Sequence, residues 1–213
     1  MNKTIIMDIF SDIKEACNKF RIRLGLYENP YLLTINQLIA QGLKIGKNVT
    51  IETNVYIDNA YPYLISIGDN CSIASGVRLL AHDDAPYKFN GGYASLGRID
   101  IKDNCFIGEN CIILPGASIG PNVLIAAGSV VNKDIPPNSC VAGVPARFYA
   151  KFDAFIENQK KQIQEAYIFD YYDLHQGTNG QTKNKVVTEI QRGKCYVKGK
   201  RGQKYFFINW NTP

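Results

Sequence analysis

The sequence is poor in residues that bind metals. It contains only two histidines, His82 and His175, and no two of its six cysteines stand in a Cys-X-X-Cys spacing. A zinc site built from Cys and His needs three or four ligands at local spacing. We therefore expect no metal site.

Long apolar runs are lacking as well. No apolar stretch approaches the ~20 residues that a membrane-spanning helix requires. Asp8, Asp12 and Glu15 interrupt the N-terminal segment where a signal peptide needs an apolar core. We therefore expect a cytoplasmic protein with no membrane span and no cleaved leader, in which disulfides are not expected. The 213 residues, 46% of them apolar, fit one main domain with appendages.

Acidic residues are missing from the C-terminal end. Between Ile190 and Pro213 there are six lysines or arginines and no aspartate or glutamate, in a chain whose net charge is +5. Such a segment is either a solvated basic surface or a surface that attracts a polyanion. The sequence leaves both interpretations open.

The dominant positive feature is an internal repeat of six residues between Leu43 and Asp134. Its phase breaks only twice, by about four residues at 61–64 and by about sixteen at 83–98. The third position of every hexad is aliphatic: Ile45, Ile51, Ile57, Ile67, Ile73, Leu79, Ile101, Ile107, Ile113, Ile119, Ile125 and Val131. Such internal periodicity indicates a repeat architecture.

A period of six fits neither an amphipathic helix nor the alternation of a flat sheet. It favours short parallel strands, three to a coil, so that residues eighteen apart stack and the aliphatic side chain points inward. A slim inward residue two positions earlier explains Cys71, Cys105 and Cys111 as core residues. The corners collect residues that tolerate positive φ: Gly46, Asn48, Gly68, Asn70, Gly108, Asn110, Gly120 and Asn122.

The segments on either side of the repeat are predicted to be appendages. Helical spacing of apolar residues from Ile9 to Leu24 predicts a cap for the open end of the solenoid. A second amphipathic helix is expected from the spacing of apolar residues between Phe148 and Tyr167. After a polar, flexible linker at 177–184, short strands are predicted at 185–190, 195–198 and 204–210, the last two forming a hairpin. The predicted organisation is therefore an N-terminal helical cap (1–42), the β-helix domain (43–147) with an active-site loop (81–98), and a C-terminal helix with a small basic β-hairpin (148–213).

The hexads, the loop beginning AHDDAPYKFNGG and the run IGENCIILPGASIGPNVLIAAGSVVNKDIPPNSCVAGVPAR carry a family resemblance. Over roughly 43–151, the chain resembles the hexapeptide-repeat acetyltransferases, and within them the galactoside, maltose and capsular-polysaccharide O-acetyltransferases. The resemblance implies a mainly β protein built as a left-handed parallel β-helix. It also implies a homotrimer with active sites between subunits, acetyl-CoA as co-substrate and a carbohydrate acceptor, as in polysaccharide biosynthesis. Neither a metal nor a nucleic-acid partner is implied.

The resemblance places the catalytic base at His82, which opens the long loop. A sugar hydroxyl is too weakly acidic to attack a thioester at neutral pH without a base, and histidine is the usual solution. Asp83 or Asp84 is a candidate to orient His82 by accepting from its second ring nitrogen, although a backbone carbonyl could equally do so. His175 lies outside the repeat, and we expect no catalytic role for it.

The thioester oxyanion and the donor also have expected partners. Glu109 stands where the galactoside and maltose enzymes carry a serine, so a backbone N–H near it would have to serve as oxyanion donor. The positions that match the family's contacts with the CoA arm and phosphates are Ala127, Gly128, Asn132, Lys133 and Arg147, with Lys151 as a weak substitute for a terminal arginine. For Ala127 and Gly128, tight coil packing is an alternative explanation.

Acceptor binding is the least defined part of the prediction. Glu52, Asn54 and Asp58 lie on coils where related sugar enzymes contact their acceptor, and Tyr87 could pack on a sugar face. The aromatic residues of the two insertions could equally form trimer contacts. An N-acetyltransferase of an amino sugar or antibiotic and a non-catalytic scaffold remain alternative functions.

Overall fold

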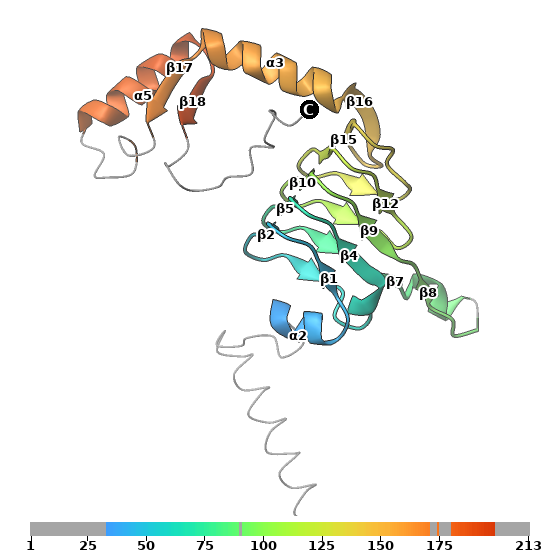
Figure 1. Cartoon of the computed structure of the whole chain (residues 1–213). Helices are drawn as coiled ribbons and strands as arrows, with labels where there is room; N and C mark the ends of the chain where they lie inside the picture. The colour runs from blue at the N-terminus through green and yellow to red at the C-terminus, as the bar shows by residue number, and fades with distance from the viewer. Residues whose placement is uncertain (1–32, 90, 171–173, 175–179, 199–213) are drawn as a thin grey trace, which may run out of the picture.

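The computed structural model describes residues 33–89, 91–170, 174 and 180–198. Its main body is a prism with three sides, each a sheet of short parallel strands (Figure 1). The predicted left-handed parallel β-helix of hexapeptide repeats is confirmed. Face A contains β1 (Lys44–Ile45), β4 (Ile65–Ile67), β9 (Ile99–Ile101) and β12 (Ser118–Ile119). Face B contains β2 (Thr50–Ile51), β5 (Ser72–Ile73), β10 (Cys105–Ile107), β13 (Val123–Ile125) and β15 (Ser139–Ala142). Face C contains β3 (Tyr56–Ile57), β6 (Arg78–Leu79), β11 (Ile112–Ile113) and β14 (Val130–Val131).

The register between coils confirms both predicted breaks of phase. Asp100 pairs with Ser118, a spacing of 18 residues, which is the regular coil. Lys44 pairs with Ser66, so the first coil contains four extra residues. Ser66 pairs with Asp100, so the second coil contains sixteen extra residues. Both insertions leave the prism where face C connects to face A.

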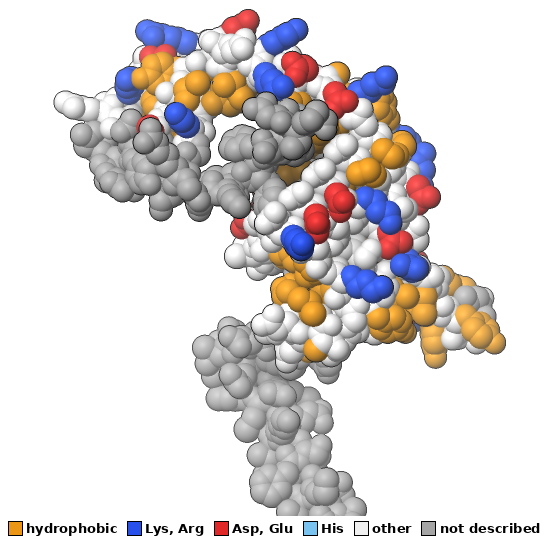
Figure 2. Space-filling view, in the orientation of Figure 1, with side chains coloured by type: hydrophobic (Ala, Val, Ile, Leu, Met, Phe, Trp, Pro, Cys, Tyr) orange, Lys and Arg blue, Asp and Glu red, His pale blue; other side chains and the backbone are white. Residues whose placement is uncertain are grey.

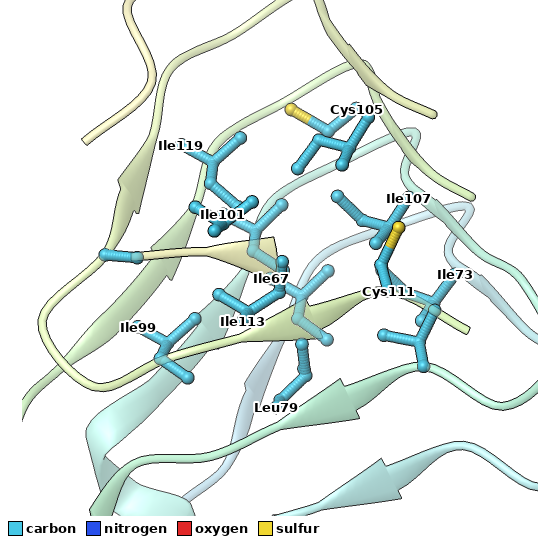
Figure 3. Close-up of a cluster of buried hydrophobic side chains, with 14 of the residues drawn as sticks. Ile67, Ile73, Leu79, Ile99, Ile101, Cys105, Ile107, Cys111, Ile113 and Ile119 are labelled. Carbon is cyan, nitrogen blue, oxygen red and sulfur yellow. The ribbon is translucent and has the colours of Figure 1, made fainter. Parts of the chain in front are cut away.

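The core is the column of aliphatic side chains inside the prism (Figure 3). Ten of the twelve predicted inward positions are buried, and the first two, Ile45 and Ile51 of the first coil, are partly buried. Burial of one such side chain contributes about 1.5–3 kcal/mol to stability. The predicted core cysteines are buried too, and the thiols of Cys71, Cys105 and Cys111 donate to backbone carbonyls of the next coil at 3.1–3.2 Å.

One corner of the prism is a ladder of asparagines with positive φ. The side-chain amides of Asn48, Asn70, Asn104 and Asn122 bond in sequence from coil to coil, each at 3.2 Å. The glycines predicted for the corners, such as Gly68 and Gly120, do not have positive φ. They are required because a Cβ at Gly120 would lie 2.6 Å from the backbone nitrogen of Pro137 in the next coil.

Short elements close both ends of the solenoid. At the first coil, α2 (Ile35–Ala40) packs Leu38 on the core and is capped by Thr34 and Gln37 in a capping box. The insertions contain η1 (Pro62–Leu64) and η2 (Ala85–Lys88). The second insertion forms a hairpin arm, β7 (His82–Asp83) with β8 (Ser95–Leu96), that projects from the prism (Figure 1). At the last coil, β16 (Arg147–Lys151) pairs antiparallel with β15.

The C-terminal extension leaves the last coil through the predicted helix, α3 (Phe152–Glu165). It continues as β17 (Tyr167–Asp170), α5 (Gly180–Arg192) and β18 (Cys195–Lys198), and β17 pairs with β18 in parallel. The predicted strand at 185–190 is therefore wrong, and so is the flexible linker from residue 180 onward. Parallel neighbours need a crossover connection, usually a helix, and Glu189–Arg192 pair at 3.0 Å along that helix.

Several expectations fall outside the described residues. These are the N-terminal helix at 9–24, the second strand of the C-terminal hairpin at 204–210, and His175. Among the described helices, none is long and apolar enough to span a membrane.

Candidate functional site

The expected site residues lie on two different edges of the prism. Edge CA, where face C connects to face A, comprises residues 58–64, 80–98, 114–117 and 132–134. Edge BC, where face B connects to face C, comprises residues 52–55, 74–77, 108–111 and 126–129. Most of the expected contacts with acetyl-CoA and acceptor divide between these two edges.

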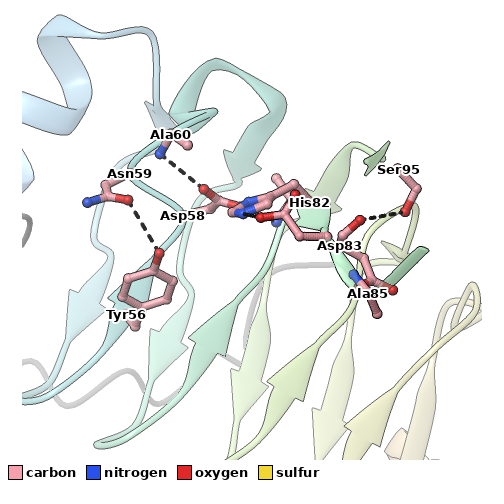
Figure 4. A network of polar contacts seen from close by, with 10 residues as sticks. Tyr56, Asp58, Asn59, Ala60, His82, Asp83, Ala85 and Ser95 are labelled. Atoms are coloured by element: carbon pink, nitrogen blue, oxygen red, sulfur yellow. Dashed lines mark hydrogen bonds and ion pairs between the residues drawn. The ribbon is translucent and has the colours of Figure 1, made fainter. Parts of the chain in front are cut away.

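His82 lies on edge CA, at the point where the second coil opens into the hairpin arm. The buried Ala81 precedes His82, and the backbone of His82 pairs with Leu96 of β8. Its side chain is 25% exposed. The imidazole Nδ1 contacts the Asp58 carboxylate, which comes from the corresponding turn of the first coil (Figure 4).

Asp58 is fully buried and its carboxylate is surrounded by donors. It accepts the backbone N–H of Ala81 at 2.9 Å and that of Ala60 at 3.1 Å, in addition to Nδ1 of His82. Coil stacking creates this arrangement, because the Asp58 N–H also donates to the Leu79 carbonyl at 2.9 Å and so fixes the carboxylate under His82. A carboxylate at Nδ1 favours the tautomer with its proton on Nδ1 and leaves the Nε2 lone pair free to accept a proton.

This arrangement differs from the expectation that Asp83 or Asp84 orients His82. Asp83 turns back on its own loop, where its carboxylate accepts the Ala85 N–H at 2.8 Å. Asp84 is 69% exposed and lies 3.6 Å from Nε2, on the outward side of the ring. Asp58, expected among the acceptor contacts, instead bonds to His82 in the interior. The repeat itself could have predicted this contact, because Asp58 and His82 lie on corresponding turns of the first and second coils.

The hairpin arm carries exposed apolar side chains. Figure 2 shows them gathered on the projection, and Tyr87, Phe89, Tyr93 and Leu96 are between 53% and 89% exposed. Tyr87, the expected acceptor contact, is thus on the arm and open to a ligand or to another subunit.

Edge BC holds a second group of expected residues. Glu52, Asn54, Glu109, Ala127 and Gly128 are all exposed there. The Glu109 carbonyl accepts the Gly128 N–H at 2.7 Å. Gly128 has φ +71°, and a Cβ built on it would meet no atom within 4 Å. The edge therefore offers open backbone beside small side chains.

The basic positions lie toward the last coil. Asn132 and Lys133 are exposed on edge CA, two coils beyond His82. Arg147 and Lys151 are exposed at the two ends of β16, and the Arg147 guanidinium bonds to the Ala146 carbonyl at 3.0 Å. All four side chains are exposed and so accessible to anionic groups in solution.

One chain does not bring the two edges together. They are separated by one six-residue side of the prism, roughly 20 Å at about 3.3 Å per residue. His82 and the open backbone at Gly128 would meet only if edge CA of one chain faces edge BC of another.

Two further observations concern potential metal ligands and the buried thiols. No cluster there of three or more His, Cys, Asp or Glu side chains could hold a metal ion. Burial raises the pKa of the Cys111 and Cys140 thiols, so that they stay protonated and are poor nucleophiles.

Comparisons with known proteins agree on the repeat. Residues 98–133 match the model described as bacterial transferase hexapeptide (six repeats), and residues 38–59 match that described as hexapeptide repeat of succinyl-transferase. The "Putative acetyltransferase YvoF" of Bacillus subtilis is 32% identical over 57% of this chain and 68% of its own length. The galactoside O-acetyltransferase of Escherichia coli is 41% identical over 49% of this chain and 52% of its own length. The chain thus spans only about half the length of several of its curated relatives.

Solved structures are similar to part of the chain. The hexapeptide-repeat acetyltransferase VCA0836 of Vibrio cholerae, solved with acetyl-CoA, is 32% identical with a TM-score of 0.48, over 53% of this chain and 61% of that one. A galactoside acetyltransferase solved with coenzyme A is 30% identical with a TM-score of 0.47, over 57% of this chain and 71% of that one.

Proposed function

The chain belongs to the hexapeptide-repeat acetyltransferase family, and we propose that it transfers the acetyl group of acetyl-CoA to a hydroxyl of a sugar or polysaccharide. The observation that carries the proposal is the pair formed by His82 and the buried Asp58 at the break in the coil. A buried carboxylate is costly unless it is paired, and this one supports a histidine whose other nitrogen faces outward.

His82 acts as the general base in a direct transfer. Its Nε2 accepts the proton of the acceptor hydroxyl as the oxygen attacks the thioester carbonyl, forming the new C–O bond. Collapse of the tetrahedral intermediate breaks the C–S bond, and the proton passes from the imidazolium to the departing CoA sulfur. Asp58 keeps the ring in one tautomer and stabilises the imidazolium. No covalent acetyl-enzyme forms, since no cysteine lies in the loop that begins at His82.

The donor site is completed by a second copy of the chain in a homotrimer. Open backbone at Ala127 and Gly128 suits an extended pantetheine arm, and Lys133 and Arg147 suit the phosphates through charge-assisted bonds. Asn132 and Lys151 are further contacts at the same end. A backbone N–H near Glu109 serves as the oxyanion donor.

The acceptor binds beside Nε2, between the hairpin arm and a neighbouring edge BC. Glu52 and Asn54 offer hydrogen bonds to hydroxyls, and Tyr87 offers an aromatic face. The exposed Asp84 carboxylate, 3.6 Å from Nε2, would also suit a cationic amine, which favours N-acetylation of an amino sugar or antibiotic as the second candidate. We place the enzyme in the cytoplasm.

A screen of donors and acceptors that monitors release of free thiol tests the proposal. Acetyl-CoA with a hydroxylated sugar should give turnover, and initial-velocity patterns should show a ternary complex. His82→Ala should lose about two to four orders of magnitude in kcat. Near wild-type turnover of His82→Ala on the preferred acceptor would overturn the assignment, and a ping-pong pattern would overturn direct transfer.

A further inference from the structure

The two insertions of the solenoid leave it at the same edge and in consecutive coils. The four extra residues of the first coil lie between β3 and β4, and the sixteen of the second lie between β6 and β9. Both connections run from face C to face A, so the first insertion stacks directly beside the turn that carries His82. Side chains of the short insertion can therefore contact the imidazole of His82.

Tyr61 is the residue of the first insertion that reaches His82. It precedes the short helix η1, in which Pro62 is buried, and its half-buried ring also packs against the core of the prism. The ring centroids of Tyr61 and His82 are 5.3 Å apart at an interplanar angle of 64°. Edge-to-face packing is one of the favoured arrangements of aromatic pairs.

The imidazole is therefore held at two places by the first coil. Asp58 bonds to its Nδ1, and the Tyr61 ring packs beside it. Asp84, the other charged group near the ring, lies at 3.6 Å on the Nε2 side and is exposed. A histidine ring turns freely about its last torsion, which has only broad preferences. A fixed aromatic neighbour restricts the torsion angles that the His82 ring can adopt. The ring is then held with Nε2 as the outward atom.

We propose that Tyr61 is a positioning residue for His82, holding the imidazole in the orientation in which Nε2 meets the acceptor hydroxyl. This inference rests on the proposed function, since it assigns His82 the role of base. The aromatic ring, rather than the hydroxyl, performs the role, because the contact is between rings. The first insertion then serves to bring the Tyr61 ring beside His82.

Tyr61→Leu, Tyr61→Phe and Tyr63→Leu test the inference. Tyr63 is a matched control, because it is an aromatic residue of the same insertion and is 57% exposed. Its ring centroid lies 6.3 Å from that of Tyr61. Tyr61→Leu should lower kcat about three- to tenfold, equivalent to about 0.7–1.4 kcal/mol, with both KM values unchanged. Tyr61→Phe and Tyr63→Leu should keep the wild-type kcat.

A combined variant separates positioning from a general structural role. In the His82→Ala background, Tyr61→Leu should cause no further loss of kcat, because the ring it orients is gone. A further loss of the same size, or an equal loss in Tyr61→Phe, would overturn the inference. So would a wild-type kcat in Tyr61→Leu. If His82→Ala itself retained full turnover, the proposed function would fail instead, so the two failures are distinguishable.

Discussion

The substitution Asp58→Asn tests the contact between Asp58 and His82, on which the proposed site depends. Asparagine has nearly the same shape, but it carries no charge and its amide nitrogen cannot accept a hydrogen bond. In the native protein the carboxylate accepts three N–H groups, from Ala60, Ala81 and His82. The substitution removes the charge that stabilises the imidazolium and leaves at least one of these donors facing a poor partner.

The expected loss results from the burial of this carboxylate. A hydrogen bond to a charged group contributes about 1.5–3 kcal/mol, which corresponds to roughly a 10- to 150-fold decrease in kcat. The KM for acetyl-CoA should change little, because the residues proposed to bind the donor lie on edge BC and toward the last coil. Steady-state kinetics on samples whose folding is checked by thermal unfolding measure both quantities.

A double-mutant cycle gives the decisive result. If Asp58 acts through His82, then Asp58→Asn in the His82→Ala background should cost almost nothing in kcat, since groups that act as a unit are strongly non-additive. Independent, additive losses would show that Asp58 does not act through His82. They would assign Asp58 to acceptor contacts or to folding alone.

Four further outcomes are expected. Removing Lys133 and Arg147 together should raise the KM for acetyl-CoA at least tenfold, given about 1.5–3 kcal/mol per charged hydrogen bond; an unchanged KM would count against the donor site. Light scattering should give three times the 23.8 kDa chain mass, and an active monomer would contradict the shared site. The Ser66 hydroxyl donates to Asp100 at 2.6 Å and lowers the pKa of that carboxyl, so this bond stabilises the fold above about pH 4 and is lost as pH falls. Ser66→Ala should therefore weaken the acid dependence of the free energy of unfolding, and an unaltered acid dependence would refute this account. Ile113→Ala, at a fully buried position, should cost about 2–5 kcal/mol in denaturant unfolding, whereas a loss under about 1 kcal/mol would mean that the core relaxes around the cavity.

The appendages show where local sequence patterns were insufficient. The sequence predicts a strand at 185–190, yet this segment lies in α5, the crossover helix between β17 and β18. The helix forms because β18 pairs in parallel with β17, whose residues lie 28 positions earlier in the chain. No local pattern in the sequence encodes that pairing. By contrast, the capping box that Thr34 and Gln37 form at α2 has a purely local sequence signal.

The solenoid, its two breaks and the place of His82 at the second break are all encoded in the repeat pattern. A repeat can be read locally, because each hexad needs the same inward aliphatic residue whichever hexad comes next, and residues such as Ile107 and Ile113 satisfy that need. The surroundings of the His82 imidazole, by contrast, depend on how the coils stack. Asp58 and Tyr61 are 24 and 21 residues before His82, and the coil offset set by the first insertion brings both beside it. The tertiary structure also separated His82 from Gly128, because a three-sided prism points successive turns in different directions.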